Sequence, residues 1–541
     1  MQKISVLFSL LGSMAFAGAE AESPLLKGIL IVDDSSKIRQ SDLDRIDGVQ
    51  FEGVVQNEAL AEELTPFFSN FPLTGNGAEV LCSAITSYYH EHDDLRVAVS
   101  IPEQDSANGV VQIVMTPERM GKLNIKENRY TEPEVLSKWV RISTADPINE
   151  KTLAQDVGWM NANPFRTVTV GYQPSDQFGV TDVDLLVSDK KSWKITTGVE
   201  NTGTMPIGET RIFAGVDIND FIFTDHTLKL KATAADHLKE YQSYSGEYTA
   251  LLPWRNTLRI FGSYLTTVPD REPYPHRQRE SFKACTRYAI PQWFGKNLWI
   301  DQITYVAGFD FKGTNTNLFF ESDPVPVDKR LAFIGQFAAG VNAVRKREGS
   351  KMAAGIDLIG SPGEMLPHQT ADDFENLRDG ASATYFYSKL DLAIEQALIQ
   401  GWNVFFQGRG QFALANLIPS EQFSLGGFNT VRGYNQDVVD GDNAVCGNFE
   451  LRTPEFGIAG LWFPRVGDKL NFLGFVDAGY AWFRDEVFDA PIDQALLSVG
   501  PGVRYSVGSY FAGRFDVGFP LLKVEKDDEK PHLHFSAVLS Y

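Results

Sequence analysis

Residues 423–434 read FSLGGFNTVRGY, and no other stretch of the chain says more about its fold. The pair Gly426-Gly427 can adopt positive φ and let two backbone segments approach closely, which a residue with a side chain resists. Arg432 carries a planar fork of donors that fits a carboxylate. Two motifs follow in order, GNFELRTP at 447–454 and FVDAG at 475–479. We therefore expect a tightly turned loop whose arginine is paired with an acidic residue.

The first residues have the pattern of a secretory signal peptide. Lys3 begins a short basic region, and the apolar stretch Ile4–Phe16 follows it. Small residues then offer cleavage after Ala17, Ala19 or Ala21. Because the apolar stretch is too short to span a bilayer, we expect export, with residues 1–21 as the signal peptide, and not a membrane anchor.

Composition limits how the exported chain could cross a membrane. After the expected signal peptide the sequence has no apolar run long enough for a transmembrane helix. Aromatic residues make up 12% of the chain, and the mean hydropathy is −0.18. A spanning protein without apolar helices must be a closed β-barrel, because a barrel satisfies every backbone group within the bilayer. Its alternating apolar pattern averages out in bulk hydropathy.

Charge and cysteine content exclude other classes. A net charge of −21 argues against nucleic-acid binding, which needs basic residues to neutralise phosphates. Cys82, Cys285 and Cys446 are widely separated and lack the spacing of a zinc site. We expect Cys82 to be buried in a helix. An oxidising compartment would allow a Cys285–Cys446 bridge, which the sequence does not establish.

The chain divides near residue 192. Before it, helical and strand patterns mix; after it, almost every stretch predicts strand and turn. The order strand, helix, helix, strand, strand occurs twice, which predicts two small α+β domains, at 26–116 and 117–190. The expected segments are Leu26–Val32, Glu58–Phe68, Ala78–His90, Arg96–Ile101 and Val110–Met115, then Lys122–Ile125, Glu132–Val140, Glu150–Met160, Thr167–Tyr172 and Asp182–Val187.

Residues 193–541 predict an antiparallel transmembrane β-barrel of sixteen strands. Candidate strands begin near residues 193, 211, 226, 241, 256, 280, 297, 329, 350, 380, 401, 444, 470, 496, 511 and 533. Several show apolar-out, polar-in alternation, as outer-membrane barrels do. The long connections Thr314–Asp328, Ser361–Asp379 and Ala413–Asn443 should all lie on the outer side, and Arg452–Lys469 is a long connection that breaks this asymmetry. Sixteen strands would leave a lumen wider than side chains alone can fill.

The motifs, in this order behind the two α+β domains, resemble those of the two-partner secretion outer-membrane transporters. This is the haemolysin secretion/activation family, within the wider superfamily of barrels that insert or export polypeptides. The α+β domains resemble polypeptide-transport-associated (POTRA) domains. The second carries family motifs, LNIKENRYTEPEVL at 123–136 and LAQDVGWMNANPFRTV at 153–168. The resemblance implies a monomer in outer-membrane lipid that captures an unfolded, β-helical partner exoprotein in the periplasm and secretes it through the barrel.

The resemblance also implies two functional sites. In the family the long loop, here Ala413–Asn443, folds back into the barrel, and its arginine contacts an aspartate on strand thirteen. These residues would be Arg432 and Asp477, and alternation in Leu470–Tyr480 directs Asp477 into the lumen. The loop lock would comprise Arg432, Asp477, Gly426, Gly427, Gly433 and Tyr434. The alternative is an acidic residue that merely lines a wet channel.

The second implied site is a sheet edge in the second POTRA domain that binds the partner by strand addition. It would comprise Thr167, Val168, Thr169, Val170 and Tyr172, with helix Glu132–Val140 as the wall of the groove. The alternative is an ordinary strand packed in a small domain.

Other clusters of polar residues have simpler interpretations. The pairs His90/His92 and His532/His534 suit a solvated helix end and the polar face of a strand. We expect an acidic turn at Asp437, Asp440, Asp442 and Asn443. We expect a solvated external loop at Asp372, Asp373 and Glu375. The oxygen atoms of Asp437, Asp440, Asp442 and Asn443 could alternatively bind calcium, but these residues lack the twelve-residue spacing of a calcium loop. We therefore expect no catalytic residues, metal or cofactor, and the chain is not predicted to be an enzyme.

One feature departs from the family pattern, in which a helix plugs the pore ahead of the first POTRA domain. The first strand here is expected near Leu26, which leaves no room for that helix after the signal peptide. Pore plugging by such a helix is therefore not expected. Alternative functions are an assembly insertase of the same superfamily and, in another class, a passive porin or adhesin.

Overall fold

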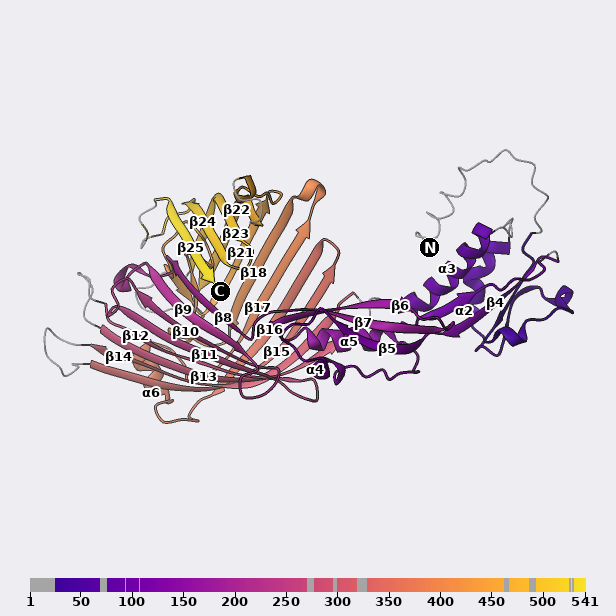
Figure 1. Ribbon diagram of the computed structural model, residues 1–541. Coiled ribbons are helices and arrows are strands. Elements are labelled where there is room, and N and C mark those ends of the chain that lie inside the picture. The colour runs from indigo at the N-terminus through magenta and orange to yellow at the C-terminus, as the bar shows by residue number, and fades with distance from the viewer. Residues whose placement is uncertain are drawn as a thin grey trace. The chain divides into compact units, whose positions relative to one another are not determined.

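The computed structural model describes residues 25–68, 75–92, 94–106, 108–269, 277–294, 299–318, 328–461, 467–485, 493–524, 527 and 530–541. The expected signal peptide, residues 1–21, lies outside these described residues. Contacts divide the chain into two compact units. One comprises residues 1–128, 133–157 and 168–187, and the other comprises 129–132, 158–167 and 188–541 (Figure 1).

The first α+β domain contains a four-stranded sheet with the strand order β2-β1-β4-β3. Its elements are β1 (Gly28–Val32), β2 (Gly48–Glu52), α2 (Glu58–Leu64), α3 (Gly75–His92), β3 (Val97–Ser100) and β4 (Val110–Pro117), with the 3-10 turns η1 (Ser35–Lys37), η2 (Leu43–Arg45) and η3 (Thr65–Phe68). Ile29 and Ile31 of β1 share a buried core with Leu60 of α2 and Ile85 of α3. Strand β2 was not predicted. It has only five residues, and Val49 and Phe51 are its only apolar side chains that pack against the core, a pattern too short to identify a strand.

The second α+β domain has the predicted order of elements and a sheet of order β5-β7-β6. It comprises β5 (Arg119–Lys126), α4 (Pro133–Ser137), α5 (Glu150–Met160), β6 (Arg166–Pro174) and β7 (Val180–Asp189). Helix α4 is shorter than the predicted Glu132–Val140 and begins at Pro133, a residue suited to the first helical position. Met120, Ile148, Leu153 and Val183 form the buried core.

Sixteen of the remaining strands close into an antiparallel barrel, which confirms the predicted fold class. The strands are β8 (Trp193–Glu200), β9 (Arg211–Asn219), β10 (His226–Ala235), β11 (Tyr241–Leu251), β12 (Thr257–Thr267), β13 (Arg277–Trp293), β14 (Gln302–Leu318), β15 (Asp328–Arg347), β16 (Ser350–Pro362), β17 (Thr384–Ala397), β18 (Asn403–Ala413), β21 (Asn443–Arg452), β22 (Asp468–Trp482), β23 (Asp493–Val507), β24 (Phe511–Pro520) and β25 (His532–Ser540). Each pairs with its neighbour, and β25 pairs with β8 to close the barrel. No helix within the described residues is long and apolar enough to cross a bilayer.

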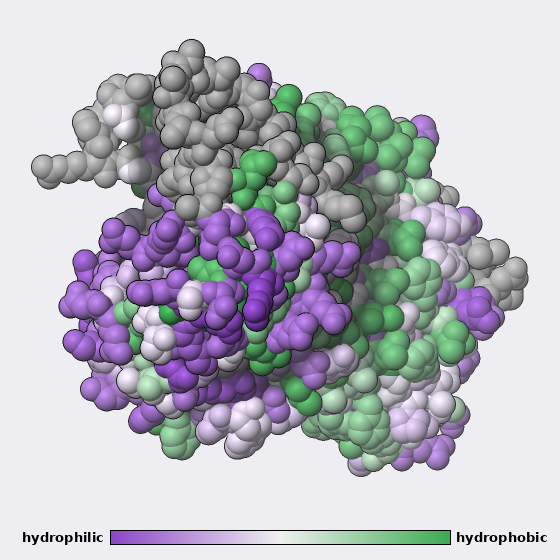
Figure 2. All heavy atoms as spheres, turned by 90° about the vertical axis from the view of Figure 1, so that its right-hand side faces the viewer, coloured by the Kyte–Doolittle hydropathy of each residue, from purple (hydrophilic) through white to green (hydrophobic). Residues whose placement is uncertain are grey.

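Alternation along the strands separates an apolar outer face from a polar lumen. In β22, Phe472, Val476 and Tyr480 are exposed on the outer side, whereas Phe475 and Asp477 between them are buried on the inner side. The visible outer face of the barrel is largely hydrophobic (Figure 2). This is the arrangement that a barrel surrounded by lipid requires.

The connections contain elements that the sequence did not predict. Within 414–442, β19 (Phe423–Leu425) pairs with β20 (Val439–Gly441). Helix α6 (Ala371–Leu377) lies in the connection that was expected to be a solvated loop, and its Phe374 is fully buried. Short 3-10 turns occupy η4 (Met205–Ile207), η5 (Ile399–Gly401) and η6 (Ala459–Leu461).

In the long connection after β21, one carboxylate holds the described residues 458–460 against the start of β22. The Asp468 side chain accepts hydrogen bonds from the backbone N–H groups of Ile458, Ala459 and Gly460, at 2.8, 2.9 and 3.4 Å. Phe456 forms a β-bridge with Leu470. Residues 456–460 therefore fold against the start of β22, and the connection stays an exception to the alternation of long and short connections.

Candidate functional site: an arginine loop inside the barrel

The loop that carries Arg432 is built on three glycines with positive φ. The φ angles are 108° for Gly426, 88° for Gly427 and 90° for Gly433, values that disfavour any other residue. The Thr430 hydroxyl accepts a hydrogen bond from the Gly426 N–H and donates one to the Gly426 carbonyl, both at 2.8 Å. These bonds close the turn that projects Arg432.

Close backbone contacts seat this turn on the barrel wall. A Cβ at Gly433 would lie 2.9 Å from the carbonyl carbon of Gly518 in β24, and one at Gly518 would lie 2.3 Å from the Gly433 nitrogen. Opposite them, a Cβ at Gly479 of β22 would lie 2.9 Å from Val431. Glycine at these positions lets the loop backbone pack directly on β24 and the Val431 side chain pack on β22.

Arg432 forms a bidentate ion pair with Asp477 of β22. Its Nε donates to Asp477 Oδ2 at 2.7 Å and its Nη2 donates to Oδ1 at 2.8 Å, while its backbone N–H donates to Oδ2 at 3.1 Å. The two side chains are 2% and 0% exposed. This planar fork is a geometry that a lysine ammonium cannot reproduce.

Two further carboxylates share the same guanidinium. Arg432 Nη1 donates to Glu450 of β21 at 2.7 Å and to Asp516 of β24 at 3.3 Å. Its Cζ lies 3.6 Å from the centre of the Phe475 ring, a cation–π contact. Asp516 also pairs with Arg504 at 2.6 Å and with Arg514 at 2.7 Å. The cluster thus balances its buried carboxylates with several arginines, as burial of charge requires.

Residues beside Arg432 anchor the loop by neutral hydrogen bonds. The buried Tyr434 hydroxyl lies 2.9 Å from the Leu497 carbonyl oxygen and 3.0 Å from that of Leu522, and its one hydrogen can be donated to either. Its oxygen accepts from the N–H groups of Leu497 and Leu522, both at 3.2 Å. The Gly433 N–H donates to Nε2 of His534 at 3.1 Å. His534 was expected to line the polar face without a specific role. The structure instead buries it beneath the loop.

The structure thus brings together all six residues of the expected loop lock. Asp477 is fully buried and paired with Arg432, whereas the wet-channel alternative calls for an exposed carboxylate. Sequence reasoning missed Glu450, Asp516 and His534. Each lies on the inner face of its strand, and that alternation is the only signal that could have found them.

Two more carboxylates, Glu421 and Asp442, hold the first and last parts of the same loop, residues 414–442. Glu421 accepts from Lys312 Nζ at 2.8 Å and from the Tyr387 hydroxyl at 2.7 Å. Asp442 forms a bidentate pair with Arg378 at 2.5 and 3.0 Å. Asp442 was expected in a plain acidic turn. It is fully buried, because Arg378 neutralises it.

The expected partner-binding edge is strand β6, an outer strand of its sheet. The Ser175 N–H donates to the Val180 carbonyl, and the Lys190 N–H donates to the Phe165 carbonyl. Both pairs fit a single antiparallel register in which the odd-numbered residues of β6 bond to β7. The even-numbered Val170 therefore directs its N–H away from β7.

Side chains of β6 alternate between the domain core and solvent. Val168 is buried, Thr167 and Thr169 are exposed, and Val170 and Tyr172 pack partly against the core. Burial raises the pKa of Tyr172 to about 12, and the Arg96 guanidinium lies 4.2 Å from its ring centre. Helix α4 contacts β5, at the opposite edge of the sheet from β6. Its role as the wall of a groove stays a prediction.

The remaining candidates have structural partners. His90 lies 2.7 Å from Glu150, and His92 stacks on Tyr88. Among the described residues, no group of three or more acidic, histidine or cysteine side chains could hold a metal. All three cysteines are free, so the Cys285–Cys446 bridge does not form, and Cys82 is half-buried where full burial was expected.

Comparison with known proteins agrees with this architecture. Residues 365–540 match the model of the Omp85 superfamily domain. The chain is similar to the outer membrane transporter CdiB of Dickeya dadantii, with 22% identity over 419 residues that cover 74% of this chain and 69% of the relative. Its fold is similar to that of CdiB from Escherichia coli, with a TM-score of 0.70, 15% identity and coverage of 100% and 97% of the two chains. For CdiB from Acinetobacter baumannii the TM-score is 0.62, with 16% identity and the same coverage.

Proposed function

We propose that this chain, a two-partner-secretion-like transporter of the Omp85 superfamily, binds an unfolded partner exoprotein in the periplasm and secretes it through its barrel. Barrels of this kind lie in the outer membrane with their POTRA domains in the periplasm. The observation that carries the proposal is the combination in one chain of two α+β domains and a closed barrel whose lumen holds an anchored arginine loop. A passive porin or adhesin needs neither feature.

Capture and transport of the partner would take place in different domains. The first POTRA domain (26–116) and the second (117–190) would capture the partner, and residues 193–541 would conduct it. The sequence contains no nucleotide-binding motif, so we infer that folding of the partner outside the cell gives transport its direction. The partner would be β-helical, and the transporter would act as a monomer in outer-membrane lipid.

The arginine loop would act as a lock on the barrel wall. Asp477, Glu450 and Asp516 come from three strands, so one guanidinium joins β21, β22 and β24. Holding a loop in this way keeps part of the lumen filled while leaving the wall closed. No bond is made or broken in this scheme, and no catalytic residue is assigned.

Strand β6 would bind the partner by strand addition. An unfolded chain carries unpaired donors and acceptors, and an added strand satisfies them with little regard for sequence. The outward direction of the Val170 N–H and the exposed Thr167 and Thr169 support this assignment.

Deletion of the gene, followed by proteomics of the medium and of the outer membrane, tests the function. We expect one large exoprotein to disappear from the medium while the barrel proteins of the outer membrane stay at their normal levels. A broad loss of outer-membrane barrels with an unchanged medium would favour the insertase. No change in either fraction would favour the porin or adhesin.

A further inference from the structure

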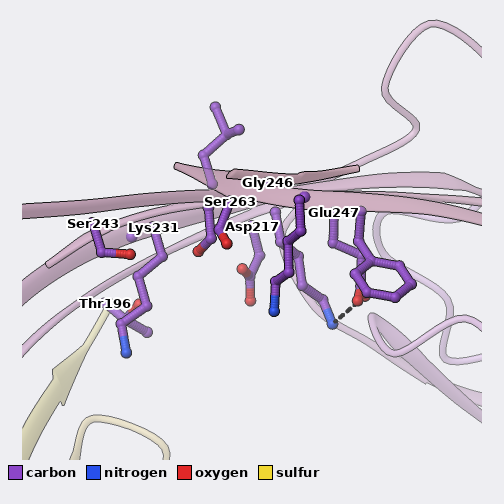
Figure 3. Close-up of a pocket in the computed structure, with 14 residues that line it drawn as sticks. Thr196, Asp217, Lys231, Ser243, Gly246, Glu247 and Ser263 are labelled. Atoms are coloured by element: carbon purple, nitrogen blue, oxygen red, sulfur yellow. Dashed lines mark hydrogen bonds and ion pairs between the residues drawn. The ribbon is translucent and has the colours of Figure 1, made fainter. Parts of the chain in front are cut away.

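The inner wall formed by β8–β13 lines a cavity of about 470 Å³ (Figure 3). The strand register defines which residues share this wall. Directly opposed positions form a row that crosses from β8 to β13 and has Lys231 and Lys283 as its charged members. The row is Thr196, Gly215, Lys231, Ser245, Ser263 and Lys283. Apart from the two lysines, this row contains only small polar residues and glycine.

A second row lies beside the first, two residues along each strand. It contains Lys194, Asp217, Lys229 and Glu247. Figure 3 shows Thr196, Lys231, Ser243 and Ser263 on the same side of the sheet as Asp217 and Glu247. Leu230, between Lys229 and Lys231, is exposed on the opposite, outer face.

These two rows and the adjacent Arg259 give the wall an excess of positive charge. The cations are Lys194, Lys229, Lys231, Arg259 and Lys283, and the carboxylates are Asp217 and Glu247. Only weak pairing reduces this excess, since Glu247 lies 3.4 Å from Lys229 and 3.9 Å from Arg259, all at partly exposed positions. The whole chain has a net charge of −21, so the sign of the charge on this wall is opposite to that of the chain.

A second cavity, of about 320 Å³, lies beside the closure of the barrel. Its lining includes Arg452, Arg504 and Arg514 together with Ser536 and Val538 of β25. Val538 is directly opposite Gly198 of β8, two residues from Thr196 in the first cavity. The three arginines pair with Glu450 and Asp516 of the arginine-loop cluster, so the excess of positive charge belongs to the wall β8–β13.

We propose that this basic wall is a binding surface for acidic segments of the extended chain in transit. The proposal rests on the proposed function for the identity of the occupant. Long, flexible lysines on a floor of serine and glycine offer point charges without shaped pockets, which suits a moving chain of varied sequence. A low-dielectric channel with an excess of one sign of charge on its wall also raises the local concentration of counter-ions. Small anions would therefore be attracted to the same wall.

Ion selectivity tests the wall without any partner protein. The full-length protein is reconstituted in a planar bilayer, and the reversal potential is measured under a KCl gradient. We expect preference for chloride, and the double variant Lys231→Gln/Lys283→Gln should lower the chloride-to-potassium permeability ratio by about threefold or more. The matched control is Lys122→Gln/Lys239→Gln, which removes two exposed lysines outside the barrel strands and should leave the ratio unchanged. A pore that prefers potassium, or one that stays shut, would overturn the proposal.

Block by peptides separates a polypeptide site from a simple anion channel. Poly-glutamate added on the POTRA side should reduce the conductance, with weaker block at high salt because salt screens the charges. Poly-lysine should not block, and the Lys231→Gln/Lys283→Gln variant should lose most of the effect. Chloride preference without block by poly-glutamate would contradict the polypeptide site. Because neither measurement uses the secreted partner, their failure is distinct from failure of the secretion function.

Discussion

Arg432 is a buried charge whose donors are almost completely satisfied. Removing a guanidinium from water costs several kcal/mol, and only paired, well-aligned acceptors compensate for this cost. Asp477 provides the bidentate partner, and Glu450 and Asp516 accept from Nη1. Because the site is buried, loss of Arg432 leaves three carboxylates with less positive charge beside them. The site thus favours a single loop position.

Substitution of Arg432 should impair secretion strongly while the barrel still folds. Breaking a buried pair typically costs about 3–5 kcal/mol, and here the cost falls on the loop, which the sixteen paired strands do not need for closure. We expect Arg432→Lys to be nearly as damaging as Arg432→Ala, because the planar fork is lost in both. Exoprotein in the medium measures secretion, and heat-modifiable migration of the barrel measures folding.

A double-mutant comparison tests the pair itself. Asp477→Ala should match Arg432→Ala, and the double variant should be no worse than either. Arg39→Ala, which breaks an exposed ion pair with Glu52, is the control and should leave secretion intact. Strictly additive losses in the double variant would show that Arg432 and Asp477 act independently.

Gly433→Ala should release the loop without changing any charge. Its φ of 90° disfavours alanine, and the added Cβ would meet the Gly518 backbone at 2.9 Å. We expect a loss of secretion close to that of Arg432→Ala. The control Gly474→Ala lies in β22, where a Cβ would meet nothing within 4 Å. Normal secretion by Gly433→Ala would show that close seating of the loop is unnecessary.

At the residue scale, sequence reasoning found the residues whose position follows from alternation within one strand. Asp477 is such a residue, because Phe472, Val476 and Tyr480 fix its orientation. Glu450 and Asp516 have the same inward orientation, but their meeting at one guanidinium depends on how three strands are staggered in the closed barrel. That stagger is set by long-range pairing, which one sequence does not reveal.

At the scale of elements, β6 combines a role in the domain core with an outward-facing edge. Replacing Val170 by proline removes an N–H that points away from β7 and so spares the ladder within the sheet. We expect Val170→Pro to weaken binding of the partner to the purified protein, measured by calorimetry or surface plasmon resonance. The barrel should assemble normally, because Val170 lies outside it.

Val170→Ala is the matched control for this variant. It shortens the same side chain but keeps the N–H, so it should bind the partner nearly as well as the unaltered protein. Thr169→Pro should instead destabilise the domain, since Thr169 has the parity that bonds to β7. Equal affinity for Val170→Pro and the unaltered protein would remove this edge from the mechanism.

Short elements were the hardest to predict. Helix α6 has only seven residues, too few to show helical periodicity, yet Thr370 and Asp373 form a capping box at its start. That local signal was present in a segment whose acidic residues suggested a solvated loop. The burial of Phe374 depends on Ala332, Ile334 and Tyr385 from distant strands, so it could not be anticipated from the segment alone.

At the scale of the whole molecule, the sixteen predicted strands were identified because alternation and turns recur throughout 193–541. The orientation across the membrane can be tested by cysteine labelling in a Cys82→Ser background, since Cys285 and Cys446 are buried. Glu364→Cys, in the exposed connection after β16, should react with an impermeant maleimide on intact cells. Asp176→Cys, in the turn between β6 and β7, should react only after the outer membrane is opened. The reverse pattern would invert the topology.

The central claim is that this chain alone moves an unfolded polypeptide across a bilayer. The most direct measurement adds the exoprotein identified by gene deletion, in unfolded form, to proteoliposomes that contain the purified transporter with its POTRA domains outside. Protease is then added, and the protected fraction is quantified. The account predicts that protected, folded exoprotein accumulates without any nucleotide, and that Arg432→Ala abolishes most of it. Complete digestion in transporter-containing vesicles, equal to that in empty vesicles, would contradict the account.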